Sequence, residues 1–101
     1  MKYKVVFHPE ATREYIDAYE WYEERQPGLG ERFILSVDDA IADIVAHPSS
    51  GRIETSMYRI KTVKTFPYII LYEVMEKKKE IYIEAIYHGK RNPKSKFRRI
   101  K

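Results

Sequence analysis

Two strand-like runs separated by a short charged turn constrain the fold of this chain most. Residues 66–75 and 80–88 are rich in β-branched and aromatic residues, and the four residues between them, 76–79, are all charged. This arrangement predicts an antiparallel β-hairpin. The first run is apolar on both faces, which is typical of a central strand. The second run leads into the sequence HGKR, residues 88–91, so the hairpin should bring a basic end to the surface.

Alternation also assigns side chains of the second run to faces of the sheet. In a regular strand one face carries Ile81, Ile83, Ala85 and Tyr87, and the other carries Tyr82, Glu84, Ile86 and His88.

Two helices are expected before this hairpin. A short β-type run at residues 4–8 ends at Pro9, and a proline is well tolerated in the first turn of a helix. Apolar and aromatic side chains then recur at spacings of three and four over residues 11–22, with most acidic residues on the other faces. Residues 27–30 contain a proline and two glycines and break the pattern. A second amphipathic helix is predicted after them, with Glu31 on its polar side, apolar side chains from Phe33 to Val45, and an end before Pro48.

A further strand is predicted over residues 57–64, where Arg59, Lys61 and Val63 alternate with the other side chains and make one face basic. The connection to the next strand is short, so these strands should pair antiparallel. The predicted order is therefore β-α-α-β-β-β, an α+β fold with a helical hairpin on one face of a small, mainly antiparallel sheet and a partly basic opposite face. We expect one domain over residues 1–101, ending in a basic tail at residues 90–101.

Charge is distributed unevenly along the chain. Residues 1–50 hold 5 Lys and Arg against 10 Asp and Glu, whereas residues 51–101 hold 14 against 5. A basic second half suggests an anionic partner such as nucleic acid, the ribosome or an acidic peptide, although opposite charges that merely keep two surfaces soluble give the same pattern. The absence of cysteine excludes disulfides, and no run approaches the ~20 apolar residues of a membrane span. We expect a soluble, cytoplasmic protein without membrane contact.

Catalytic and cofactor signatures are sparse. No Gly-rich phosphate loop or zinc-binding histidine pair is present, so neither a metal nor another cofactor is expected. Trp21 lies off the main apolar stripe of the first helix, which fits either an exposed anchor for a partner or, more commonly, a packed boundary residue.

One cationic set remains as a candidate site, formed by Arg59, Lys61, Lys64, His88, Lys90 and Arg91. If strand pairing brings these residues together, they could bind a phosphodiester or stabilise the charge that develops during its cleavage. His88 is the candidate general acid or base by its ordinary pKa. The alternative is that Arg59 and Lys61 are solvent-facing strand residues and that His88 caps a strand. We favour binding over catalysis.

Three segments together resemble the RelE/ParE toxin superfamily, in particular its ParE-like plasmid stabilisation branch. They are WYEERQPGLGERF at residues 21–33, FPY at residues 66–68 and YHGKRNP at residues 87–93. The resemblance covers nearly the whole chain. It implies a small toxin of a type II toxin–antitoxin pair, neutralised by a cognate antitoxin whose C-terminal segment wraps around it.

The branch of the superfamily decides the mechanism that the resemblance implies. RelE-like members cleave mRNA on the ribosome, whereas characterised ParE members poison DNA gyrase without being nucleases. The RelE-like pattern has an arginine where this chain has Ile69, and a C-terminal tyrosine where the nearest equivalent is Phe97. Arg91 and Lys61 match a catalytic arginine and a strand lysine of that pattern, so the nuclease set is incomplete.

We therefore predict a ParE-like toxin that is not a nuclease. Its basic sheet face, with the cationic set, and its C-terminal segment should bind a large target, DNA gyrase, while an apolar groove accepts a helix or strand of the antitoxin. The resemblance does not identify the antitoxin-binding residues. Two alternatives stay open. One is a ribosome-dependent mRNA endonuclease with Arg91, Lys61, Arg59 and His88 as catalytic residues, and the other is a non-toxic binding module on the same fold.

Overall fold

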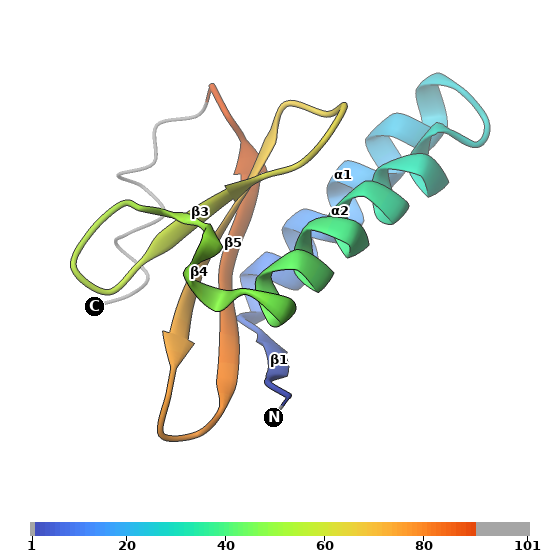
Figure 1. Cartoon of the computed structure of the whole chain (residues 1–101). Helices are drawn as coiled ribbons and strands as arrows, with labels where there is room; N and C mark the ends of the chain where they lie inside the picture. Colours follow the sequence, from blue (N-terminus) through green and yellow to red (C-terminus); the bar gives the residue numbers. More distant parts are fainter. Residues whose placement is uncertain (1, 91–101) are drawn as a thin grey trace.

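Two antiparallel helices pack on one face of a five-stranded sheet (Figure 1). The computed structural model describes residues 2–90, which form an α+β fold as predicted. In chain order the elements are β1 (Lys4–Phe7), α1 (Pro9–Arg25), α2 (Leu29–Ala46), the short 3-10 helix η1 (Pro48–Ser50), β2 (Arg52–Ile53), β3 (Arg59–Thr62), β4 (Tyr68–Met75) and β5 (Glu80–His88).

The sheet has the strand order β1-β5-β4-β3-β2. The predicted hairpin is confirmed, because β4 and β5 pair antiparallel from Met75–Glu80 at the turn to Tyr68–His88 at the open end. β1 pairs parallel with β5, so the sheet is mainly antiparallel with one parallel edge. The helical hairpin makes this possible, since it carries the chain across one sheet face between β1 and the other strands. The two-residue strand β2 has no counterpart in the prediction.

Local chemistry explains where the helices begin and end. The Nδ1 atom of His8 accepts a hydrogen bond from the Glu10 backbone N–H at 3.0 Å and caps α1, which starts at Pro9. The Glu23 carboxylate accepts hydrogen bonds from the backbone N–H groups of Gly28 and Gly30 at 2.9 and 3.0 Å, which places a negative charge at the N-terminus of α2. Neither helix is long and apolar enough to cross a membrane.

Both faces of the sheet bury apolar side chains. The larger cluster lies between helices and sheet and comprises Ala11, Ala18, Phe33, Val37, Ala40, Ile44, Val63, Phe66, Ile70, Tyr72, Ile81, Ile83 and Ile86. The smaller cluster lies on the opposite face and comprises Tyr58, Ile60, Leu71, Ala85 and Tyr87. β4 contributes to both clusters, as expected of a central strand.

A β-bulge in β5 changes which way its side chains point. Tyr72 pairs with Ile83 while the preceding Leu71 pairs with Ala85, so Glu84 is an extra residue between the two pairs. Ile83 therefore faces the helices and Ala85 the opposite side. The prediction that Ile81, Ile83, Ala85 and Tyr87 share one face is wrong, because one inserted residue reverses every assignment beyond it.

Candidate functional site

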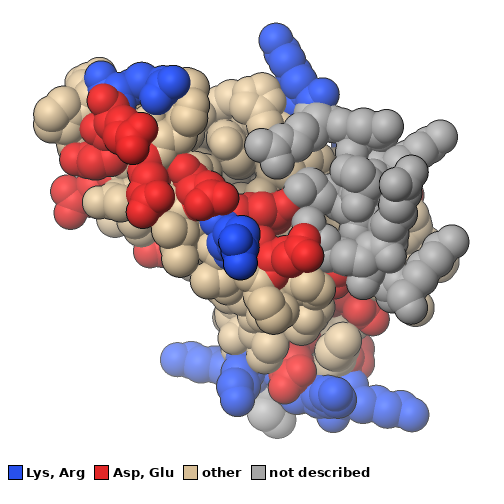
Figure 2. All heavy atoms as spheres, turned by 180° about the vertical axis from the view of Figure 1, so that it is seen from behind, with Lys and Arg blue, Asp and Glu red and all other residues tan. Residues whose placement is uncertain are grey.

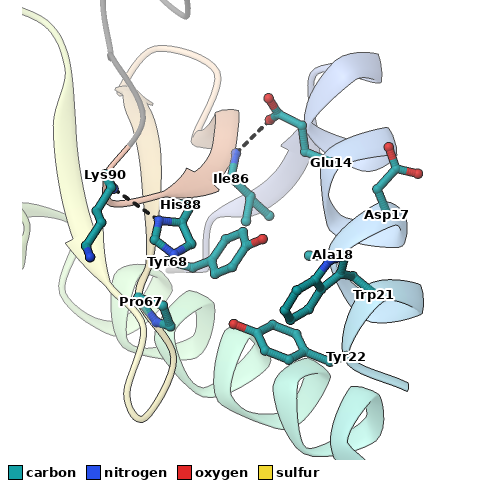
Figure 3. A pocket seen from close by; sticks show the side chains of 10 residues that line it. All are labelled: Glu14, Asp17, Ala18, Trp21, Tyr22, Pro67, Tyr68, Ile86, His88 and Lys90. Atoms are coloured by element: carbon teal, nitrogen blue, oxygen red, sulfur yellow. Dashed lines mark hydrogen bonds between the residues drawn. The ribbon is translucent and has the colours of Figure 1, made fainter. Parts of the chain in front are cut away.

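A groove of about 660 Å³ lies between α1 and the open end of the β4–β5 hairpin (Figure 3). Its lining combines aromatic, acidic and basic side chains: Glu14, Asp17, Ala18, Trp21, Tyr22, Pro67, Tyr68, Ile86, His88 and Lys90. The helix supplies the acidic wall and the hairpin supplies the basic one.

The bulge and the short length of β1 together shape this groove. Beyond Glu84, the side chain of Ile86 turns toward the helices. The parallel edge strand pairs with β5 only as far as Ile83, so the Ile86 backbone N–H lies beyond its reach. The Glu14 carboxylate accepts a hydrogen bond from that N–H at 2.9 Å (Figure 3). Glu14 thus satisfies a donor at the sheet edge and fixes α1 against β5.

Three aromatic side chains line the groove. The rings of Trp21, Tyr22 and Tyr68 are turned toward it (Figure 3). Trp21 is 51 % exposed, contacts Tyr22 edge-on with ring centroids 5.2 Å apart, and has the Arg25 guanidinium 3.6 Å from its ring centroid. Tyr22 packs edge-on against Phe66 at 4.9 Å. Burial raises the pKa of Tyr22, with its neighbour Tyr68 as a smaller cause.

His88 and Lys90 form the basic side of the groove. His88 pairs with Tyr68 across the hairpin, and their rings meet edge-on with centroids 5.6 Å apart. The Lys90 backbone N–H donates to His88 Nδ1 at 3.1 Å. In the neutral imidazole Nε2 then carries the proton and is the atom left to donate to a ligand.

The other predicted cations lie on the far side of β4, at the edge that α2 covers. The Arg59 guanidinium donates to the carbonyl oxygens of Ser49 and Gly51 at 3.2 and 2.9 Å. Lys61 Nζ lies 3.8 Å from an Asp43 carboxylate oxygen. Both cations therefore lie on the helix-covered face of the sheet. The prediction that they make the opposite face basic is wrong.

The structure therefore separates the predicted set into two groups. Lys61 pairs with Ile70 and Ile70 with Ile86, so β4 keeps the β3 backbone about 10 Å from β5. Lys61 and Lys64 line a second hollow of about 360 Å³ beside α2. Within residues 2–90, His88 and Lys90 are the members of the set that line the groove. Arg91 and the rest of the predicted tail lie outside the described residues.

Most of the acidic and aromatic residues that α1 contributes to the groove were not predicted as site residues from the sequence. Trp21 gave a signal by lying off the apolar stripe, and it is half exposed while its ring packs against Tyr22 and Arg25. Glu14 and Asp17 gave none, because they look like other acidic residues on the outer face of an amphipathic helix. Among the described residues no group of three His, Asp or Glu side chains is placed to hold a metal ion.

Comparison with known proteins gives a family and a set of similar structures. Residues 5–93 match the family model of the ParE toxin of the type II toxin–antitoxin system parDE. No match to the sequence was found among curated proteins. The fold is similar to the chromosomal ParDE toxin–antitoxin system from P. aeruginosa, with a TM-score of 0.72 and 20% identity over 85% of this chain and 95% of that chain.

Two RelE structures are also similar. A double arginine mutant of E. coli toxin RelE in the free state gives a TM-score of 0.68 and 13% identity over 89% of this chain and 86% of that chain. The archaeal RelE–RelB complex from Pyrococcus horikoshii gives a TM-score of 0.53 and 18% identity over 91% of this chain and 100% of that chain. At these identities the likeness shows a shared fold.

Proposed function

The chain belongs to the family of ParE toxins of type II toxin–antitoxin systems, and on that premise we propose that it inhibits growth by binding DNA gyrase rather than by cleaving RNA. We place this activity in the cytoplasm, as the toxin of a plasmid stabilisation system.

Ile69 is the observation that carries the choice of target. The RelE-like pattern has an arginine at this place, and one such stabiliser of transition-state charge is worth about 3–4 kcal/mol. Ile69 instead packs against the apolar cluster on the sheet face opposite the helices. The separation of Arg59 and Lys61 from His88 supports the same choice. A general acid or base must lie within hydrogen-bond reach of the proton that it transfers, and the cations that stabilise the transition state must contact the same phosphodiester, whereas β4 lies between these two groups.

We further propose that a segment of the cognate antitoxin occupies the groove beside α1. Two of the similar structures are toxin–antitoxin assemblies, the ParDE system and the RelE–RelB complex. The groove has the composition of a partner site, with an exposed Trp21 beside Tyr22 and charges of opposite sign on its two walls. An apolar anchor on the antitoxin would bury against the aromatic rings, and basic and acidic neighbours would pair with Asp17 and Lys90.

Expression in a growing culture tests the proposed target class. Induction of the chain should slow growth, and primer extension on translated mRNA from the same cells should show no new cleavage sites. The matched variant is His88→Gln, which removes the candidate acid or base of the groove and should leave mRNA equally intact. Cleavage at defined sites with the unmodified chain, lost in His88→Gln, would replace the gyrase proposal by the mRNA endonuclease. Normal growth on induction would contradict toxicity and would support the alternative of a non-toxic binding module.

A further inference from the structure

A group of lysines gathers at the end of the molecule opposite the groove. Lys77, Lys78 and Lys79 form the β4–β5 turn, and Lys2 and Lys4 lie at the start of β1; all five side chains are exposed. The Lys4 backbone N–H donates to the Lys79 carbonyl oxygen at 2.9 Å, which brings the two segments side by side. We call these five residues the lysine apex. Figure 2 shows Lys and Arg side chains projecting from this end, and acidic side chains gathered over the helices.

The apex is held by a small network that does not cancel its charge. The Tyr3 hydroxyl donates to the Glu76 carboxylate at 2.9 Å, and Lys79 Nζ lies 3.3 Å from the same carboxylate. These contacts, the Tyr3 hydrogen bond first, hold the pKa of Glu76 below its ordinary value. Within residues 2–90, the acidic residues of this turn are Glu76 and Glu80, so the five lysines leave this end of the hairpin with a net positive charge.

The chemistry of the apex fits a phosphate backbone better than an apolar protein hot spot or the interior of a membrane. The exposed large apolar side chains of residues 2–90 are Ile16, Trp21, Leu35, Ile53 and Met57, and none of them lies at the apex. An apolar anchor for a protein hot spot or for membrane insertion is therefore missing from this part of the described chain. Lysine ammonium groups, in contrast, bind phosphates as point charges.

The contacts that Tyr3 already makes within the protein favour double-stranded over single-stranded nucleic acid as the ligand. Proteins that hold single strands stack bases on aromatic rings. Tyr3 is the aromatic residue nearest the turn, but its hydroxyl is bonded to Glu76 and Lys79 Nζ lies 5.3 Å from its ring centroid. The ring thus already has partners on one side, whereas contacts to a duplex backbone need only the ammonium groups.

We propose that the lysine apex binds the phosphodiester backbone of duplex DNA. Apart from the lysine apex and its neighbours Glu76 and Glu80, residues 2–90 carry 8 Lys and Arg against 13 Asp and Glu, so the rest of the described part of the chain is net negative and is repelled by a phosphate backbone. The apex and the groove lie at opposite ends of the eight-residue strand β4, about 25 Å apart, so both can be occupied at once. The choice of DNA over RNA rests on the proposed function, because gyrase acts on duplex DNA.

The salt dependence of DNA binding tests the proposal without gyrase. Fluorescence anisotropy with a labelled 20-base-pair duplex gives the affinity at several salt concentrations. Each phosphate contact contributes about 0.9 to the slope of log affinity against log salt, so Lys77→Gln/Lys78→Gln should reduce the slope by about 1.8 and the affinity about 60-fold at 0.1 M salt. Lys77→Arg/Lys78→Arg keeps the charge and should keep the slope. The basic residues of 91–101 are the same in every variant, so differences report on the apex.

Arg13→Gln/Arg32→Gln is the matched control, because it removes the same charge from the exposed faces of the helices. It should change the affinity less than threefold. An unchanged slope in the lysine variant, or an equal loss in the helix control, would overturn the proposal. A larger effect on a matched RNA duplex would overturn the choice of DNA, and displacement of the duplex by polyglutamate at equal charge would point to an acidic protein instead. None of these outcomes depends on whether gyrase is inhibited.

Discussion

Removing the hydroxyl of Tyr72 should destabilise the fold far more than the loss of one oxygen suggests. Tyr72 is fully buried, and its hydroxyl donates to the Pro48 carbonyl oxygen at 2.8 Å and accepts from the Gly51 backbone N–H at 3.0 Å. Both partners belong to the segment that joins α2 to β2. Phenylalanine keeps the ring packing, so Tyr72→Phe isolates the two hydrogen bonds.

The expected loss of stability follows from the two backbone groups that Tyr72→Phe leaves without a hydrogen-bond partner. A buried polar group that loses its partner costs about 1–3 kcal/mol, and the Gly51 N–H and the Pro48 carbonyl both lose theirs. We expect a loss of about 2 kcal/mol in the free energy of unfolding, which lowers Tm by about 8–16 °C in a domain of this size. Urea denaturation followed by tryptophan fluorescence at constant m-value measures the first quantity, and thermal denaturation followed by circular dichroism measures the second.

Tyr82→Phe serves as the control, because Tyr82 is only partly buried on β5 and loses the same atom. It should change the free energy of unfolding by less than about 0.5 kcal/mol. If Tyr72→Phe also stays within that range, the hydroxyl does not hold the α2–β2 segment and the reasoning is refuted. The result also bears on Arg59, whose guanidinium donates to the same segment, since a loss of toxicity in an Arg59 variant would then reflect folding.

Three further perturbations test the packing and the charges. Gly30→Ala would place a Cβ 2.6 Å from the Tyr19 carbonyl oxygen. It should therefore lower the free energy of unfolding by about 1–3 kcal/mol, although alanine usually stabilises a helix relative to glycine. A variant that is more stable in urea would contradict the close approach of the two helices. Burial, followed by the hydrogen bond to Asp38, raises the pKa of Tyr15 above 10.0, so its contribution to stability is complete below pH 10 and is lost as the pH rises toward the pKa of the folded state. Tyr15→Phe should therefore reduce the alkaline slope by up to about 1.4 kcal/mol per pH unit, and identical pH profiles would refute this linkage. Lys61→Ala breaks a 3.8 Å ion pair in which the Asp43 side chain is 64% exposed and the Lys61 side chain 23% exposed, and it should cost less than about 1 kcal/mol in urea denaturation, whereas a larger loss would assign Lys61 a structural role.

The helices and the hairpin could be predicted because their periodicity is repeated over many residues. Helical spacing over residues 11–22 and strand alternation on both sides of residues 76–79 leave few alternatives once the turn residues are placed. The family resemblance came from short segments in order, and the match over residues 5–93 confirms it.

The candidate site was harder to predict because it depends on single residues and on pairing across the sheet. The bulge at Glu84 changes no composition and leaves no mark in the sequence, yet it reverses the faces beyond it. Alternation correctly grouped Arg59 with Lys61, but it does not tell which face of the strand the helices cover. That face follows from the pairing of Arg59 with Tyr72 and of Lys61 with Ile70, whose side chains lie in the cluster under the helices. The two cations then contact Asp43 and the carbonyl oxygens of Ser49 and Gly51.

Supercoiling of relaxed plasmid by purified gyrase, with increasing amounts of the purified chain, tests the central claim most directly. The proposed function predicts that the chain inhibits supercoiling. Lys64→Gln and Lys90→Gln each remove one exposed cation of the set predicted from the sequence, one from each of the two groups into which the fold separates it, so weaker inhibition in one variant at unchanged Tm identifies the group that contacts gyrase. Full supercoiling activity at a large molar excess of folded chain would contradict the proposed function.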